Sequence, residues 1–202
     1  MPKPKFKRGV KKRISSSKYL VVELGCGINP FNIDALKIDA IENDLIDIVT
    51  NLNQGIPLPD DSVDEIHSYH FLEHVDDLGY LMKEINRVLK PGGLCIGSVP
   101  HFSNPYFYSD FTHKSFFGLY SFSYFDDEQS VFKRKCPTFY SKNFFKITEV
   151  KLIFKSPFYG RFILKKIIQF FVNLSRYTKE FYEENLVYIF PAYEIYFVLK
   201  KA

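Results

Sequence analysis

The stretch VVELGCGINP, residues 21–30, decides the fold of this chain. It joins an apolar run, YLVVEL at residues 19–24, to a turn in which Gly25 and Gly27 flank Cys26. A continuous apolar run of this length is typical of a buried parallel strand. Two glycines at its end permit a sharp turn and leave the backbone amides unobstructed. The stretch therefore predicts a ligand-binding turn at the carboxyl edge of a parallel sheet.

Apolar segments on both sides of this stretch predict the rest of the sheet. Strands are expected at residues 35–39, 45–49, 63–69, 94–100, 144–155 and 193–200. Between residues 76 and 90, apolar side chains recur at helical spacing, with Asp76 or Asp77 as the N-cap and Pro91-Gly92-Gly93 as the stop. Strands and a crossover helix alternate as they do in a doubly wound parallel sheet.

The connections within this sheet are short at its beginning. Only eleven residues separate Gly27 from Asp39, and eight separate Asp39 from Ile48, so the first two crossovers must be loops or single turns. The last two strands enclose a helical stretch in the sequence, so we expect them to form an antiparallel pair. The predicted fold is α/β, with a Rossmann-like doubly wound sheet, reduced early crossover helices and an aromatic helical cap.

Length and charge set the expected organisation. The 202 residues fit one domain, which we place at residues 19–202 behind a basic arm at 1–18, with cap elements at 101–142 and 157–191. The arm contains eight Lys or Arg and no acid. Such segregation suits a polyanion, a membrane surface or an anionic substrate. Because no RNA-binding module is recognisable, we expect no nucleic-acid partner and an arm that is disordered or packs at the sheet edge.

The cysteines and the N-terminus bear on location. Cys26, Cys95 and Cys136 lie far apart without a Cys-x-x-Cys pair, which argues against a disulfide framework and a thiolate metal site. Serines follow the basic start where a signal peptide needs an apolar run, and no segment approaches the length of a spanning helix. We expect a cytoplasmic protein.

Asp39, at the end of the second expected strand, is placed to accept hydrogen bonds from ribose hydroxyls. The dinucleotide fingerprint requires a third glycine, but Ile28, Asn29 and Pro30 occupy the positions after Gly27. A pyrophosphate therefore has no obvious cradle. These residues favour a nucleoside ligand and make a nicotinamide cofactor the second choice.

A family resemblance covers residues 19–100. VVELGCGINP, Asp39, NLNQGIPLPDDSVDEIHSYHFLEHV at residues 51–75, the helix ending VLKPGG and the strand LCIGSVP together resemble a class I S-adenosylmethionine-dependent methyltransferase of the small-molecule, methyltransferase type 11-like kind. The segment SVPHFSNPYFYSDFTHKSFFG further resembles a subgroup with an Asp-x-Thr-His signature, often associated with surface-polysaccharide loci. The resemblance implies the class I methyltransferase fold and S-adenosylmethionine as cofactor.

The resemblance also implies roles for single residues. Glu23 and the turn Gly25-Cys26-Gly27 would contact the methionine end of the cofactor, and Asp39 would bind its ribose. In the same resemblance, Asn51 and Leu52 would flank the adenine, and Tyr69 and His70 would line the sulfonium side. The chain departs from the family at Asn51, where an acid is common.

The expected reaction is methyl transfer to an oxygen or nitrogen of a small polar acceptor, such as a sugar or a glycan-linked group. His101, His113 and Asp110 follow the strand that ends at Pro100, so they are candidates for the acceptor side, where a base accepts a proton. The structural alternative is that Asp110 and Thr112 cap a turn. Rival functions are a NAD-dependent oxidoreductase and a non-catalytic interaction module.

Two further patterns have competing interpretations. His70-Phe71-Leu72-Glu73-His74 fits the His-x-x-Glu-His motif of zinc proteases, with His67 as another candidate ligand. That motif needs one long helix, whereas this stretch follows a strand, so we expect no metal and a loop position for His74. The apolar stripe of a second predicted helix, at 162–174, favours core or dimer contact over a peripheral membrane contact that Lys165 and Lys166 would support. The chain is expected to be a monomer or homodimer.

Overall fold

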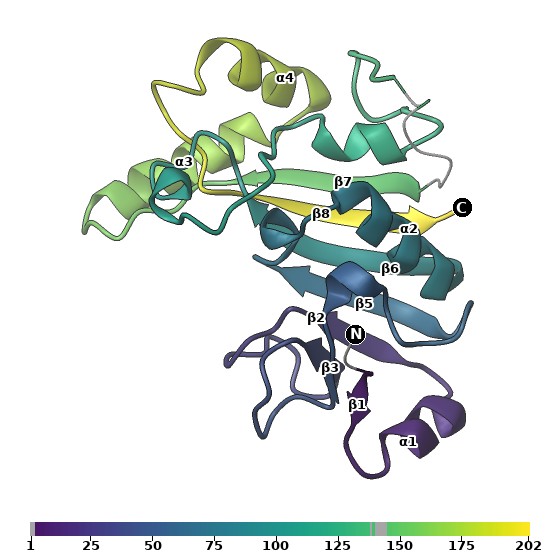
Figure 1. The fold of residues 1–202 in the computed structure, drawn as a ribbon. Helices are drawn as coiled ribbons and strands as arrows, with labels where there is room; N and C mark the ends of the chain where they lie inside the picture. Colours follow the sequence, from purple (N-terminus) through teal and green to yellow (C-terminus); the bar gives the residue numbers. More distant parts are fainter. Residues whose placement is uncertain (1–2, 138, 140–144) are drawn as a thin grey trace.

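The computed structural model describes residues 3–137, 139 and 145–202. Within these residues an eight-stranded sheet runs in the order β1-β4-β3-β2-β5-β6-β8-β7 (Figure 1). The strands are β1 (Lys5–Phe6), β2 (Val21–Leu24), β3 (Leu36–Asp39), β4 (Ile48–Val49), β5 (Val63–Tyr69), β6 (Leu89–Pro100), β7 (Phe145–Ile153) and β8 (Glu194–Lys201). The helices are α1 (Val10–Ser16), α2 (Leu78–Val88), α3 (Arg161–Val172) and α4 (Arg176–Asn185).

The centre of the sheet is parallel, as the sequence predicts. β2 pairs in parallel with β3 on one side and with β5 on the other, and β5 pairs in parallel with β6. β8 lies between β6 and β7 and is antiparallel to both. The predicted α/β fold with a closing antiparallel pair is therefore confirmed, and the loops after β2, β3, β5 and β6 leave the sheet at one edge.

Local sequence explains the central elements. Val22 and Leu24 of β2 are completely buried, which accounts for the uninterrupted apolar run. α2 begins after Asp77, whose side chain accepts a hydrogen bond from the backbone N–H of Tyr80, so Asp77 is the N-cap. The helix ends at Val88, before the predicted stop, because Leu89 already pairs with Val63 as the first residue of β6.

The early crossovers are loops. In the part of the chain that the structure describes, the connections from β2 to β3 and from β3 to β4 contain no helix, as their lengths predict. The basic N-terminal segment extends this end of the sheet, since β1 pairs antiparallel with β4 and α1 buries Val10. Residues 3–16 thus supply an edge strand and a helix.

Most of the aromatic segment after β6 packs onto the sheet. Two 3₁₀ turns, Phe107–Ser109 and Ser121–Phe125, interrupt an otherwise irregular chain. The ring of Phe122 lies 4.2 Å from that of Phe197 on β8, centroid to centroid. Residues 117–125 therefore belong to the core, and the beginning of the segment remains near the sheet edge. Positions 138 and 140–142 of the predicted cap lie outside the described residues.

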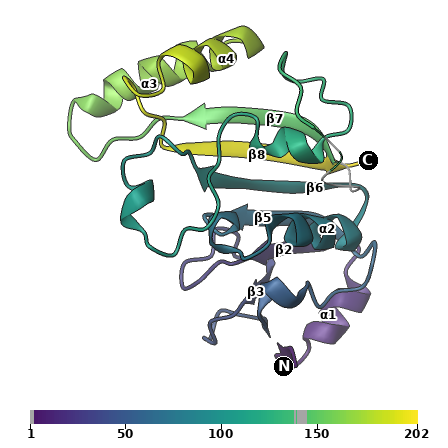
Figure 2. The same cartoon turned by 45° about the horizontal axis from the view of Figure 1, so that its top comes forward.

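α3 and α4 lie along β7 at the far edge of the sheet (Figure 2). α3 confirms the predicted helix, but only Val172 of it is buried. Ile163, Phe170 and Leu174 of the apolar stripe are 57–65% exposed. The core packing predicted for this stripe is wrong, and a dimer contact stays a prediction. No helix among the described residues has both the length and the apolar character needed to cross a bilayer.

Candidate active site at the carboxyl edge of the sheet

Gly27 and Asp39 join the first two loops of this edge. The backbone N–H of Gly27 donates to Asp39 Oδ2 over 2.8 Å, and the carbonyl of Gly27 accepts from Asn43 Nδ2 over 3.2 Å. Asp39 Oδ1 accepts from the backbone N–H of Ile41 over 2.9 Å. A Cβ added at Gly27 would meet no atom within 4 Å, so open space lies beside its backbone. Each oxygen of Asp39 keeps a further lone pair for a ligand.

Gly25 serves packing instead of a ligand. Its φ is +66°, and a Cβ there would lie 2.1 Å from the ring of Phe71. Cys26, between the two glycines, is half-buried. Burial, with smaller contributions from Glu23 and Asp39, raises the pKa of its thiol to about 12. The turn therefore presents the neutral thiol of Cys26, and its backbone is open to a ligand at Gly27 but not at Gly25.

Glu23 holds the loop that follows Gly27. Its side chain is buried, and its two carboxylate oxygens accept from the backbone N–H groups of Phe31 and Asn32 over 2.8 and 2.9 Å. These bonds position that loop against the sheet. The contact of Glu23 with the methionine end of a cofactor stays a prediction.

Asn51 and Leu52 begin the 3₁₀ turn Leu52–Gln54. The side chain of Asn51 accepts from the backbone N–H of Asn53 over 3.0 Å, which makes it the cap of this turn. The side chain of Leu52 is buried in the core. Leu52 can therefore face an adenine only with its backbone. The exposed part of Asn51 can face it too.

A cavity of about 170 Å³ opens beyond the ends of β5 and β6. Tyr69 and Ser98, which are partners in the β5–β6 pairing, line its base. The ring of Phe31 covers Tyr69 with centroids 4.3 Å apart. The wall is completed by His70, Ile153, Lys155, Glu194 and Tyr196. The cavity thus combines aromatic surface with two opposite charges.

His70 lies at the rim of this cavity in a left-handed conformation, with φ +51°. Its Nε2 is 2.9 Å from Glu194 Oε2, and its Nδ1 is 3.5 Å from Glu73 Oε1. Hydrogen bonds to Glu194 and Glu73 outweigh burial and raise the pKa of the His70 imidazole to about 9. His70 is therefore a cation at neutral pH.

A second cavity, of about 230 Å³, shares His70 with the first. His113 and Asp110 line it, with Nε2 of His113 3.6 Å from Asp110 Oδ2. His113 Nδ1 is 2.9 Å from the backbone carbonyl of Phe107, an acceptor, so Nδ1 bears the proton and Nε2 is bare in the neutral ring. The hydroxyl of Thr112 donates to Asp110 and lowers the pKa of its carboxyl. The structure therefore brings together His70, His113 and Asp110.

His101 lies elsewhere. It is completely buried, with Nδ1 2.8 Å from Ser103 Oγ and Nε2 2.9 Å from Glu183 Oε2. Both ring nitrogens thus have partners inside the protein, and His101 lines neither cavity described above. We therefore remove His101 from the groups expected to touch an acceptor, although it directly follows β6.

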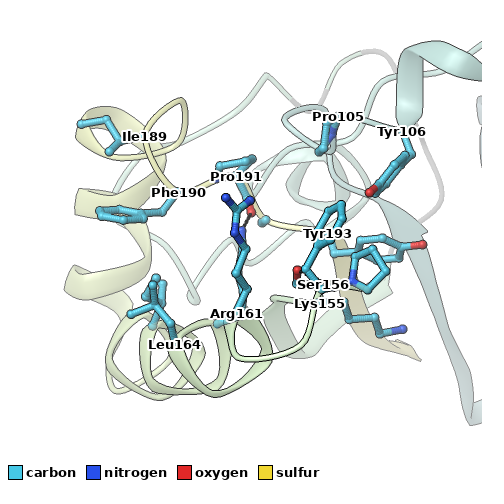
Figure 3. A pocket seen from close by; sticks show the side chains of 15 residues that line it. Pro105, Tyr106, Lys155, Ser156, Arg161, Leu164, Ile189, Phe190, Pro191 and Tyr193 are labelled. Carbon is cyan, nitrogen blue, oxygen red and sulfur yellow. Dashed lines mark hydrogen bonds between the residues drawn. The ribbon is translucent and has the colours of Figure 1, made fainter.

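A third hollow, of about 400 Å³, adjoins the second through Tyr106 and Tyr193. Figure 3 shows the side chain of Arg161 rising from α3 towards Pro191, with Leu164 and Phe190 on one side and Tyr193 on the other. Lys155 and Lys165 also line the hollow, and none of its described lining residues is acidic. The hollow is therefore apolar with a positive charge.

The sequence did not single out several residues of this site. Glu194 begins β8 and Lys155 lies in the loop just after β7. Their ion pair, 2.8 Å long, reaches His70 only because β8 inserts beside β6. Ile41, two positions after Asp39, is more than half exposed. An apolar residue after a strand-end acid was the one available signal, whereas nothing local marked Glu194.

Comparisons with known proteins agree with this geometry. Residues 17–97 match a family described as "Methyltransferase domain". A search of curated protein sequences found no match. Among solved structures, an S-adenosylmethionine-dependent methyltransferase from Archaeoglobus fulgidus is 16% identical with a TM-score of 0.56, covering 96% of this chain and 90% of its own. One from Mesorhizobium loti is 15% identical with a TM-score of 0.54, covering 90% of each chain.

A third neighbour was solved with S-adenosyl-L-methionine bound. It is phosphoethanolamine N-methyltransferase 2 from Haemonchus contortus, 13% identical with a TM-score of 0.53, and the match covers 96% of this chain and 51% of that one. Likeness at this identity shows a common fold, and the family match identifies the segment that forms the ligand edge. Residues 17–97 thus match a methyltransferase domain, and the chain has the fold of S-adenosylmethionine-dependent methyltransferases.

Proposed function

We propose that this protein transfers the methyl group of S-adenosylmethionine to an oxygen or nitrogen of a small polar acceptor, a sugar or sugar-linked group with an anionic substituent. The observation that supports this most is that two cavities meet at His70. One is lined by Phe31, from the loop that follows the glycine turn, and the other by His113. A methyl donor and an acceptor in these two spaces would meet at the ends of β5 and β6.

The residues present fit S-adenosylmethionine. The open space beside Gly27 leaves room for the cofactor backbone, and Asp39 would accept hydrogen bonds from its ribose hydroxyls. Tyr69 and Phe31 offer aromatic surface next to the sulfonium. Ile41 offers an apolar surface for the adenine. The cofactor supplies an electrophilic methyl group, so the protein mainly has to align the acceptor.

His113 is the proposed base. It would take the proton that the acceptor loses as the acceptor atom bonds to the methyl carbon and S-adenosylhomocysteine leaves with the electron pair on sulfur. The backbone carbonyl of Phe107 fixes the Nδ1–H tautomer, which keeps Nε2 free to accept. Asp110, near that nitrogen, would stabilise the imidazolium that forms.

The third hollow supports the anionic acceptor. Lys165 donates to the carbonyl of Pro191 over 2.6 Å, and Lys155 pairs with Glu194. Arg161 projects into the space between these groups (Figure 3). A guanidinium there suits a phosphate or carboxylate, because it can donate two parallel hydrogen bonds. Tyr106 and Tyr193 connect this charge to the cavity of His113.

The proposal is tested by measuring label transfer from methyl-labelled S-adenosylmethionine to matched pairs of sugars, one member of each pair with a phosphate or carboxylate and one without. We expect label transfer to hydroxyl or amine acceptors and faster transfer to the anionic member of a pair. Arg161→Gln should raise KM for that member and leave KM for S-adenosylmethionine unchanged, whereas Lys166→Gln on the same helix should change neither. Transfer that is indifferent to acceptor charge and to Arg161 would overturn the acceptor class.

A further inference from the structure

Glu73 is a buried carboxylate with one oxygen, Oε2, that has no hydrogen-bond partner among the described residues. Its side chain is 1% exposed. Its Oε1 has only the distant nitrogens of His70 and His74, at 3.5 and 3.9 Å. A buried charge is costly unless it is paired or coordinates a metal. His70 pairs with this carboxylate through Oε1, so Oε2 keeps its lone pairs for a further ligand.

Two imidazoles face the same space. One ligand atom from each of Glu73, His74 and His113 lies within 4.8 Å of the other two. Ligands of a tetrahedral Zn²⁺ at about 2.0 Å from the metal are about 3.3 Å apart. The side chains must therefore close by roughly 1.5 Å at most. Glu73 and His74 belong to a single 3₁₀ turn and His113 to a loop, so side-chain rotation can supply that movement.

Hydrogen bonds prepare both histidines as ligands. Thr112 Oγ1 donates its proton to Asp110 Oδ1 over 2.6 Å, so it can only accept from His74 Nδ1, 2.9 Å away. His113 Nδ1 donates to the carbonyl of Phe107. Each ring therefore keeps its bare Nε2 for a ligand. Metal-binding histidines are held in this way, with the other N–H bound to a carbonyl or a hydrogen-bonded network.

We propose that Glu73, His74 and His113 bind a divalent transition-metal cation with the ligand preference of Zn²⁺. Two imidazoles and one carboxylate are the protein ligands of open zinc sites, which leave a position for water or substrate. All three residues line the 230 Å³ cavity, so that position faces the space assigned to the acceptor. The His-x-x-Glu-His stretch supplies two ligands, and the third comes from the loop after β6, not from one long helix.

The cation would change how the acceptor is activated, a consequence that rests on the proposed function. His113 would take the acceptor's proton, as proposed above, only in the metal-free protein, because the bound metal occupies its Nε2. A hydroxyl bound to the open position would lose its proton to water or to Asp110 more easily, because a bound cation lowers the pKa of its ligand. His113 would then act on the acceptor through the cation.

Calorimetric titration of the chelator-treated full chain with Zn²⁺, without cofactor or acceptor, tests the site. We expect saturable binding of one Zn²⁺ that Mg²⁺ does not compete away, since imidazole ligands disfavour Mg²⁺. Loss of a residue that supports a metal ligand lowers metal affinity about 10–100-fold. His113→Asn and Glu73→Gln remove ligands themselves, so they should lower the Zn²⁺ affinity at least as much. Thr112→Val, which removes only the support of His74, should fall in that range. His67→Gln, outside the cluster, should bind as the wild type does.

Absence of saturable Zn²⁺ binding would overturn the proposal. So would binding that His113→Asn and Thr112→Val leave unchanged. Thr112 is exposed, so Thr112→Val keeps the test decisive if Glu73→Gln does not fold. A parallel titration with S-adenosylhomocysteine separates this outcome from a failure of the proposed function. A protein that binds S-adenosylhomocysteine but no Zn²⁺ keeps its methyltransferase assignment and loses the metal site.

Discussion

Gly27 and Asp39, twelve positions apart, are joined by a hydrogen bond of 2.8 Å from the backbone N–H of the glycine to the carboxylate. The bond connects the loop after β2 to the end of β3 without an intervening helix. Asn43 adds a second connection to the same glycine through its carbonyl. Asp39 therefore both shapes the turn and offers its remaining lone pairs to a ligand.

Replacing Asp39 by alanine should weaken S-adenosylmethionine binding. Hydrogen bonds to a charged group contribute about 1.5–3 kcal/mol, which corresponds to roughly a ten- to hundredfold loss of affinity. Calorimetric titration measures the loss, and Asp44→Ala, at an exposed acid in the following loop, is the control. Unchanged affinity in a folded Asp39→Ala protein would remove Asp39 from the cofactor site.

The two glycines of the turn should respond differently to substitution. Gly27→Val should abolish cofactor binding, because the added side chain enters open space, and should cost about 1–3 kcal/mol of stability, because φ is +55° there. Gly25→Ala should destabilise the protein by about 1–3 kcal/mol through overpacking against Phe71. Circular dichroism melts recorded beside each titration distinguish the two effects. If Gly27→Val unfolds the chain, that glycine serves the turn alone.

Glu84 should make stability depend on pH. Its carboxylate accepts from Arg87 Nε over 2.8 Å and from the backbone N–H of Ile56 over 3.0 Å. The hydrogen bonds from Arg87 lower the pKa of Glu84 below its usual 4.5. A lowered folded-state pKa stabilises the protein above the unfolded value, and this stability is lost as pH falls through the folded value.

The test compares melting temperatures of wild type and Glu84→Gln. We expect a lower melting temperature for the variant at pH 7 and a difference that shrinks as the pH falls below about 4.5. Glu42→Gln, at an exposed ion pair with Lys5, should show almost no difference at either pH. A difference for Glu84→Gln that stays constant down to pH 2 would contradict this assignment.

His101 and His113 should separate stability from catalysis. His101→Ala leaves the Glu183 carboxylate without its imidazole, and an unsatisfied buried group costs about 1–3 kcal/mol, so the melting temperature should fall while turnover persists. His113→Ala should lower turnover by about 10²–10⁴ and leave cofactor affinity nearly unchanged. Turnover is measured with an acceptor found in the labelling assay. Near-normal turnover in His113→Ala would exclude His113 as the base at the acceptor side.

The fold was predictable where the apolar pattern of a single helix or strand shows which of its side chains are buried. The apolar run at Val21–Leu24 and the stripe of α2 identify their elements without any partner. α1 and α4 were missed because each buries a single side chain, Val10 or Tyr182, and shows no stripe. α3 is the opposite case, because its apolar stripe correctly predicted a helix but the stripe is exposed. Periodicity indicates a helix and does not indicate which part of the protein covers its apolar face.

The site was predictable where it follows strand ends. Gly27 and Asp39 occupy the edge that their strands predict. His101 was misplaced because its partner Glu183 lies 82 positions away, on α4, and draws the ring inward. Glu73, His74 and His113 were visible one by one, but their meeting depends on the return of the loop after β6, which no local pattern encodes.

Titration of the wild-type chain with S-adenosylhomocysteine and, separately, with NAD tests the central claim most directly. The account predicts saturable binding of one S-adenosylhomocysteine per chain, its loss in a folded Gly27→Val protein, and no binding of NAD, because the turn has no third glycine for a pyrophosphate. Binding of NAD in its place, or a folded wild-type chain that binds neither ligand, would contradict the assignment.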